Sequence, residues 1–240
     1  MRAELRKLIT ARSTWLLLAI AQLIVVAGVS GLMLQRDDPA SDDAQRGAIA
    51  HVGLVALFGL LIGILAVAGE YRHRTITDTF LARPHRDRVV LSKLVVAAGA
   101  GAVLGVVASA TALITDAIWL AAKGLSIDLA SGVLWRTVAG GIGWNIAFAA
   151  IGVGVGALIT NLSAAVAAAL GWLALVEGIV GELIGDASRW LPFALGQALV
   201  GLPNSADRPQ AWQAGLVLVL YVAVFVAAGI GVTTRRDITH

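Results

Sequence analysis

The sequence contains no cysteine and few charged residues, and both absences limit what the chain can do. Without cysteine it can form no disulfide, no thiolate metal site and no cysteine nucleophile. Lysine is also scarce, since only Lys7, Lys93 and Lys123 occur in the whole chain. None of them stands in the G-x-x-x-x-G-K-[ST] pattern that cradles nucleotide phosphates. We therefore expect no ATP site of that kind, no enzyme activity of its own, and no bound cofactor or metal in this chain.

Apolar residues take the place of the missing charges. They make up 58% of the chain, against 14% for charged residues, and the mean hydropathy is +0.85. The charges are clustered, which leaves runs of about 20 uncharged residues that match a ~30 Å hydrocarbon core. The sequence therefore predicts an all-α, polytopic membrane protein in contact with the lipid bilayer. Basic loops explain the net charge of +3, and we expect no nucleic-acid binding.

Six spans are predicted within a single domain of residues 1–240. The uncharged run Thr137–Val176 is too long for one span, so the polar Thr160–Ser163 is predicted as a hairpin turn. Small-residue pairs that favour close helix packing occur at Gly59/Gly63, Gly101/Gly105 and Gly152/Gly156. The expected spans are Ser13–Leu34, Ala48–Gly69, Val90–Leu113 with an extension to Trp119, Leu134–Ile159, Ala164–Gly185 and Ala214–Val232.

Three segments outside the spans have features of their own. Residues 1–12 place apolar side chains on one helical face, which is typical of an interfacial helix; a plain basic flank is the alternative. The acidic, proline-containing Gln35–Gly47 is predicted as a loop. Residues 186–211 include Leu191–Leu202, an apolar stretch too short to span. We expect this external segment to be re-entrant or interfacial.

The distribution of Lys and Arg predicts the orientation. Of 18 such residues, four precede the first span, six lie between the second and third, and two follow the last. These segments share one side if there are six spans, and basic loops face the cytoplasm. We therefore predict cytoplasmic termini and a cytoplasmic Glu70–Lys93 segment.

Polar residues inside spans are candidates for function, because burying them in lipid is costly. Glu177, in the fifth span, is predicted to lie on a substrate or ion path; the alternative is a residue near the interface that reaches water or pairs with Arg189. Asn145 could line the same path or form a hydrogen bond between helices. Asp116 and Arg136, at outer span ends, are expected to reach towards water; pairing with each other is the alternative.

A serine motif offers a different functional class. Gly28-Val29-Ser30-Gly31 resembles a G-x-S-G pattern, and His51 begins the next span. Such a pair could supply the nucleophile and base of an intramembrane serine protease. The alternative is that Ser30 ends one helix and His51 begins another.

The longest charged segment between apolar runs is Glu70–Lys93. A helix is predicted over His73–Leu81, ending before Pro84 because residues before proline avoid helical angles. Ile76 and Phe80 are i,i+4 neighbours and form a predicted apolar anchor. Such a centre with a charged rim suits docking of a partner, whereas the alternative is a plain basic connector. The rim is predicted to consist of Arg72, Arg74, Asp78 and Arg83.

Three stretches and the closing residues then occur in a definite order along this topology. They are GEYRHRTIT at Gly69–Thr77, GVGVGALITN at Gly152–Asn161, RWLPF at Arg189–Phe193, and RRDI at Arg235–Ile238. Together they resemble the membrane subunit, or permease, of ABC-2 type ABC transporters. Arg74 departs from the pattern, because the family often has glycine before the threonine.

The resemblance implies an exporter in the bacterial plasma membrane. Its partners would be cytoplasmic ATP-binding subunits, which hold ATP and Mg, and a second copy of this chain or a similar permease. The cargo would be a drug, antibiotic or peptide-like molecule, with a lipid or an ion as alternatives. In the family, the segment after the second span forms a coupling helix in a groove of the ATP-binding subunit. The implied contact residues are Glu70, Tyr71, Arg72, Arg74, Ile76, Phe80 and Arg83.

Overall fold

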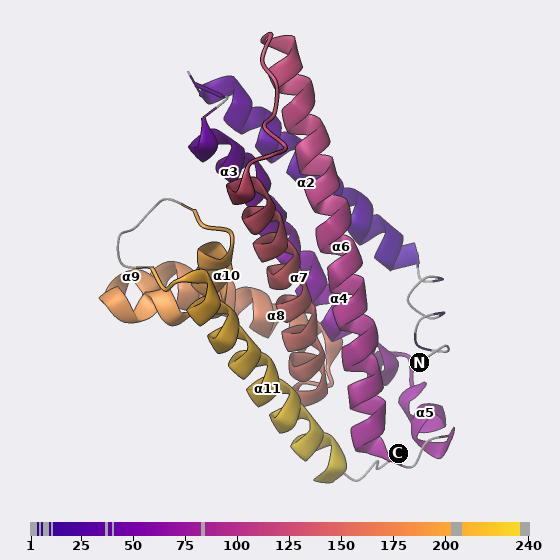
Figure 1. Cartoon of the computed structure of the whole chain (residues 1–240). Helices are drawn as coiled ribbons and strands as arrows, with labels where there is room; N and C mark the ends of the chain where they lie inside the picture. The colour runs from indigo at the N-terminus through magenta and orange to yellow at the C-terminus, as the bar shows by residue number, and fades with distance from the viewer. Residues whose placement is uncertain are drawn as a thin grey trace.

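The computed structural model describes residues 4, 6, 10, 12–36, 38–39, 41–82, 85–202 and 208–235, apart from the side chains of Asp42, Asp78, Phe80, Ala82 and Val180. Within these residues every regular element is helical (Figure 1). The interfacial helix predicted for residues 1–12 lies largely outside them. The helices are α2 (Arg12–Gln35), α3 (Asp42–Ala50), α4 (Val52–Arg72), α5 (Ile76–Ala82), α6 (Arg86–Ala122), α7 (Gly132–Leu158), α8 (Leu162–Gly171), the π-helix η1 (Trp172–Val180), α9 (Gly181–Leu183), the 3-10 helix η2 (Gly185–Trp190), α10 (Pro192–Leu199) and α11 (Ala211–Arg235).

The described residues form six helices long and apolar enough to cross a membrane, which confirms the predicted spans. They are residues 12–35, 43–72, 86–122, 132–158, 162–183 and 211–235. The third is longer than predicted: α6 has 37 residues, or about 56 Å at 1.5 Å per residue. It therefore extends well beyond a ~30 Å hydrocarbon core, and Figure 1 shows it rising above the neighbouring helices.

The segment predicted as a loop before the second span is partly helical. Ser41 caps α3, because its hydroxyl oxygen accepts a hydrogen bond from the Ala44 amide at 3.3 Å. This bond satisfies one of the amides that a helix start leaves unpaired. The loop prediction for Gln35–Gly47 was therefore wrong from Asp42 onwards, where α3 continues almost directly into α4.

The centre of the bundle is the packing of α7 against α4, α6 and α11. Glycines allow the backbones to approach closely. A Cβ on Gly152 of α7 would overlap the Leu60 carbonyl oxygen of α4, and one on Gly63 would overlap the Ala149 carbonyl oxygen of α7. A Cβ on Gly101 of α6 would likewise lie only 2.6 Å from the Asn145 carbonyl oxygen of α7. The small-residue pairs found in the sequence therefore do mark close helix contacts.

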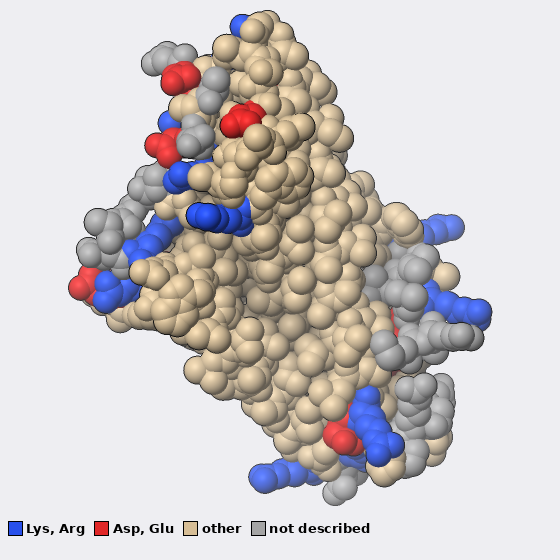
Figure 2. Space-filling model, viewed as in Figure 1, with Lys and Arg blue, Asp and Glu red and all other residues tan. Residues whose placement is uncertain are grey.

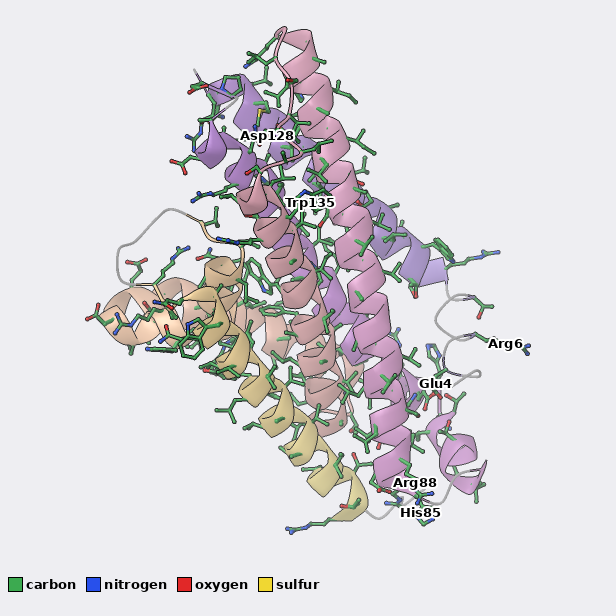
Figure 3. The ribbon with its side chains drawn as sticks, in the orientation of Figure 1. Glu4, Arg6, His85, Arg88, Asp128 and Trp135 are labelled. Atoms are coloured by element: carbon green, nitrogen blue, oxygen red, sulfur yellow. The ribbon has the colours of Figure 1, made fainter. Side chains whose placement is uncertain are left out.

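Figure 2 shows charged side chains around the margin of this face of the bundle, whereas its centre is largely uncharged. At one end, Arg86 Nη1 of α6 donates to the Thr233 carbonyl oxygen of α11 at 3.1 Å. At the opposite end, Lys123 Nζ donates to the Met33 carbonyl oxygen at 2.8 Å, so α2 and α6 run parallel. Figure 3 shows the same division, with His85 and Arg88 at one end and Asp128 at the other.

Candidate functional site

The candidate site lies where α4 ends, α5 follows and α6 begins. α4 continues through Arg72, so Glu70–Arg72 belong to the spanning helix rather than to the connector. Arg74 has φ 56°, in the left-handed region that favours glycine. The Thr75 amide donates to the Glu70 carbonyl oxygen at 3.0 Å, and the Arg74 amide to that of Tyr71 at 3.2 Å. These two bonds form a Schellman motif, with Arg74 at the position where glycine is usual.

This turn changes where the next helix starts. The sequence predicted a helix over His73–Leu81, whereas α5 runs Ile76–Ala82. The left-handed Arg74 separates it from α4, which explains why a continuous helix from His73 does not form. α5 ends before Pro84, a residue outside the described ranges.

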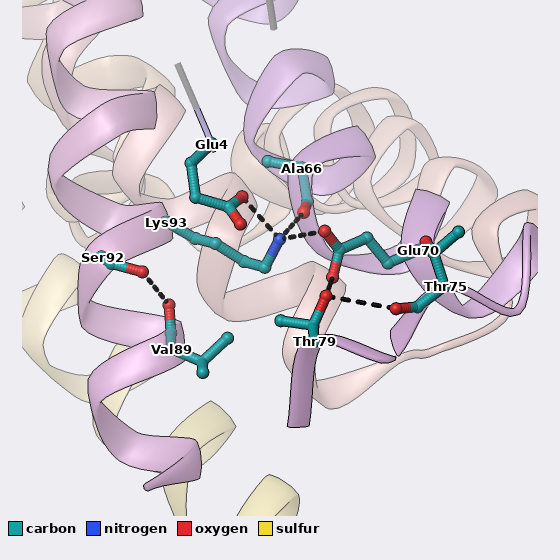
Figure 4. Close-up of polar contacts among 8 residues, drawn as sticks. All are labelled: Glu4, Ala66, Glu70, Thr75, Thr79, Val89, Ser92 and Lys93. Atoms are coloured by element: carbon teal, nitrogen blue, oxygen red, sulfur yellow. Dashed lines mark hydrogen bonds and ion pairs between the residues drawn. The ribbon is translucent and has the colours of Figure 1, made fainter. Parts of the chain in front are cut away.

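A buried lysine joins three segments of the chain at this turn (Figure 4). The Lys93 side chain is 1% exposed, and its Nζ lies 2.8 Å from Glu70 Oε1 and 2.8 Å from Glu4 Oε2. It also donates to the Ala66 carbonyl oxygen at 2.8 Å. Because an ammonium group has three protons, these three acceptors satisfy it completely. Figure 3 places Glu4 beside α6, near α5.

Glu70 also reaches α5. The Thr79 hydroxyl lies 3.3 Å from Glu70 Oε2 and 3.1 Å from the Thr75 carbonyl oxygen. One carboxylate of α4 therefore contacts α6 with one oxygen and α5 with the other. Ile76 adds an apolar contact, since it is 6% exposed and packs with Val89 of α6 and with Tyr71.

The surface of this end differs from the one predicted. Ile76 was predicted as an exposed anchor but packs inside the chain, so it fixes α5 to the bundle. Leu81 is instead 78% exposed, and Arg72 and Arg74, before α5, are exposed as well. The Phe80 side chain and all of Arg83 lie outside the described residues. Contact of this segment with a partner stays a prediction.

A cavity of about 400 Å³ lies beside the ionic cluster. Lys93 and both of its carboxylate partners line it, together with residues of α2, α4 and Leu162. The pairing of Lys93 with two carboxylates makes it a junction between helices rather than a nucleophile. Among the described residues, no group of three or more His, Asp or Glu is placed to hold a metal ion.

Glu177 occupies a second polar position, in η1. Its Oε2 accepts from the Phe193 amide at 2.7 Å and from the Ala194 amide at 3.3 Å. Both amides belong to the first turn of α10, where a carboxylate is favoured by the helix dipole. Glu177 therefore fastens the predicted external segment to the fifth span. In that segment, burial lowers the pKa of Arg208, whose Nη2 donates to Gln197 Oε1 at 3.0 Å.

Asn145 is fully buried at the contact of α7 with α4. Its Nδ2 donates to the Val52 carbonyl oxygen at 3.1 Å and to that of Gly141 at 2.8 Å. This is the interhelical hydrogen bond that the sequence allowed as one of two roles. The adjacent Trp144 packs edge-on against Phe193 of α10, with ring centroids 5.0 Å apart. Asn145 and Glu177 thus belong to different contacts, and a role of either in transport stays a prediction.

Ser30 and His51 have separate partners. The Ser30 hydroxyl accepts from Trp119 Nε1 at 3.0 Å, and His51 Nδ1 contacts the Gly47 carbonyl oxygen at 2.8 Å. Neither contact joins the two residues as a nucleophile and base. Asp116 also differs from expectation: it is 0% exposed rather than directed towards water, and no hydrogen bond reaches its carboxylate among the described residues.

Lys93, Glu4 and Thr79 belong to the site but were not predicted from the sequence. Lys93 was counted only as a basic flank of the third span. A signal was present, because Lys93 follows Val89, Val90 and Leu91 and so stands a turn inside the apolar run. A lysine at such a position needs an acidic partner, and Glu70, at the end of the preceding span, was one candidate beside Asp78 and Asp87.

Comparison with known proteins adds no family to these observations. No protein-family model matches the chain, and no curated protein matches its sequence.

Proposed function

We propose that the chain is the membrane-spanning permease subunit of an ATP-driven exporter of the ABC-2 type. It would act with separate ATP-binding subunits and with a second copy of itself or a similar permease. Its cargo would be a drug, antibiotic or peptide-like molecule, and a lipid or an ion is the alternative. The six spans supply the membrane path, and the missing phosphate-binding loop makes a partner ATPase necessary.

One observation carries the proposal: α5 is a short helix held at the end of the bundle by contacts to two spans. Glu70 of α4 bonds both Lys93 of α6 and Thr79 of α5. Ile76 packs against Val89. A helix that only connected two spans would not need these ties. A helix that receives a push from a partner needs them, because force must pass from it into the spans.

The outer surface of this turn also suits docking. Leu81 of α5 is exposed, and so are Arg72 and Arg74 of the turn that precedes α5. Arginine is enriched in protein interfaces, and the centre of an interface is apolar, so this surface has both kinds of side chain. The plain-connector alternative predicts that this surface tolerates charge.

The test compares the same substitution at two exposed leucines that lie at opposite ends of the bundle. Leu81→Asp places a charge on α5, and Leu129→Asp places one in the far loop, where Leu129 is 57% exposed. The chain is purified from its native membrane after mild crosslinking. Co-purifying subunits are checked for the phosphate-binding loop by mass spectrometry and for ATP hydrolysis.

We expect the wild type and Leu129→Asp to retain an ATP-binding subunit. Leu81→Asp should retain at least tenfold less ATP-binding subunit. Burying the new charge against an apolar pocket of the partner would cost about 1.4 kcal/mol or more, which is a factor of ten in affinity. Equal retention by both variants would refute docking through α5. Failure of any ATP-binding subunit to accompany the wild type would refute the proposed function itself.

A further inference from the structure

Two cavities of opposite character meet at Glu177. One, of about 180 Å³, lies between α4, α7, α8 and α11, and among the described residues that line it Glu177 alone is ionisable. The other, of about 420 Å³, is polar and is lined by Arg189, Arg208 and Gln197. Glu177 and Leu173 line both cavities. The carboxylate therefore stands at the boundary between an apolar and a polar space.

The two oxygens of Glu177 are not equivalent. Oε2 is held by the Phe193 and Ala194 amides at 2.7 and 3.3 Å. Oε1 is buried, and no hydrogen bond of ordinary geometry reaches it from the described residues, although the Trp172 side chain interacts with the carboxylate. Leaving a buried acceptor unpaired costs about 1–3 kcal/mol, and more for a charged group. Such an arrangement is stable when a donor from outside the chain completes it.

The backbone supports this interpretation. Glu177 lies within η1, a nine-residue π-helix. Wide turns of this kind are rare, and they occur frequently at functional sites. The widened turn is continuous with α8 on one side and α9 on the other. It therefore changes the direction of side chains locally, within an otherwise regular span.

We propose that this junction binds an amphipathic amine, whose apolar part fills the 180 Å³ cavity and whose N–H group donates to Glu177 Oε1. A cavity of about 150 Å³ accommodates benzene, so the space fits one aromatic ring or a short alkyl chain. An acid is disfavoured because its carboxylate would meet that of Glu177. A cationic amine is favoured over an alcohol, because charge-assisted hydrogen bonds are about twice as strong as neutral ones.

This inference deepens the proposed function, since it rests on that function for the idea that the bound amine is cargo. Binding itself requires neither nucleotide nor a partner. It can therefore be present even if no ATP-binding subunit associates with the chain, and the two proposals can fail separately.

The experiment uses three probes of one shape: 4-phenylbutylamine, 4-phenylbutanol and 4-phenylbutyrate. Equilibrium binding is measured to the full chain in phosphatidylcholine nanodiscs, with empty nanodiscs subtracted. We expect the amine to bind at least tenfold more tightly than the acid, with the alcohol between them. Glu177→Gln should weaken amine binding at least tenfold and alcohol binding less than threefold.

Two further variants separate binding from folding. Ala168→Leu narrows the apolar cavity from an exposed position on α8 and should weaken all three probes. Asp186→Asn changes an exposed carboxylate that does not line either cavity, and should leave binding unchanged. Thermal unfolding of each variant shows whether it is folded. Gln can still accept an amide hydrogen bond, so the start of α10 keeps its cap in Glu177→Gln.

Equal affinity for acid and amine, unchanged amine binding in Glu177→Gln, or unchanged binding of all probes in Ala168→Leu would each overturn the proposal. A parallel arm uses nanodiscs that contain phosphatidylethanolamine, a lipid with a primary amine. Competition by this lipid would support the site and identify lipid as the source of the amine. Undiminished probe binding there would support the site and identify a soluble amine instead.

Discussion

Replacing Lys93 by methionine removes the cation that Glu4 and Glu70 share. The Lys93 side chain is 1% exposed, and those of Glu4 and Glu70 are 13% and 8% exposed. Water therefore cannot solvate the two carboxylates once the lysine is gone. Breaking a buried ion pair costs about 3–5 kcal/mol, because the remaining charge is buried without a partner. Methionine keeps most of the apolar stem, so little of this cost comes from packing. We expect Lys93→Met to lower the midpoint of thermal unfolding by roughly 6–20 °C.

The assay is thermal unfolding of the purified chain in detergent, with Arg88→Met as the matched control. Arg88 lies on the same helix but is exposed, so its replacement should shift the midpoint by no more than about 1 °C. Glu70→Gln in the Lys93→Met background should recover part of the loss, because it removes one uncompensated charge. An equal shift in Lys93→Met and Arg88→Met, or no recovery in the double variant, would refute the ionic junction.

Three further predictions follow from the packing of the bundle. Arg74→Gly should stabilise the chain by about 1 kcal/mol, roughly 2–4 °C, because glycine adopts φ 56° without strain; Arg72→Gly, inside α4, should destabilise it by a similar amount. Gly152→Ala should prevent correct folding, measured by gel filtration, because its Cβ would overlap Leu60; Gly99→Ala, where nothing lies within 4 Å, should be neutral or stabilising. Asn145→Leu should cost only about 0.6–1.7 kcal/mol in unfolding, since one interhelical hydrogen bond is lost while the unpaired Oδ1 disappears with it. A loss above about 4 kcal/mol in Asn145→Leu would show that its role is larger than this contact.

Hydropathy predicted the spans because bilayer thickness fixes helix length, and all six were found near their expected positions. The start of α3 was missed, because proline and aspartate dominated the composition and the cap formed by Ser41 was overlooked. The start of α5 was missed for a different reason. Only Arg74 adopts the left-handed region among the described residues other than glycine, and arginine itself gives no signal for it; the one available signal was the glycine that the resembled family often has at this position.

The inward face of α5 could not be predicted either. α5 has seven residues, about two turns, and periodicity over so short a helix does not say which side meets the bundle. Ile76 and Leu81 are both large and apolar, yet one is buried and the other exposed. The choice depends on Val89 and Tyr71, which only the tertiary structure brings to Ile76. The ion pair of Lys93 with Glu70 could have been predicted from the sequence, whereas its pair with the distant Glu4 could not.

These contacts give α6 a particular part in the proposed exporter. Val89 and Lys93 are one turn apart on α6. Val89 packs against Ile76 of α5, and Lys93 forms the ion pair with Glu70 of α4. At the other end of the same helix, Trp119 and Lys123 bond Ser30 and Met33 of α2. Between Val89 and Trp119 the helix is continuous over about 45 Å. A continuous helix transmits tilt from end to end, whereas a loop absorbs it. A displacement of α5 would therefore move the far end of α2. An exporter of the proposed type, whose path opens alternately to the two faces of the membrane, needs such coupling between them.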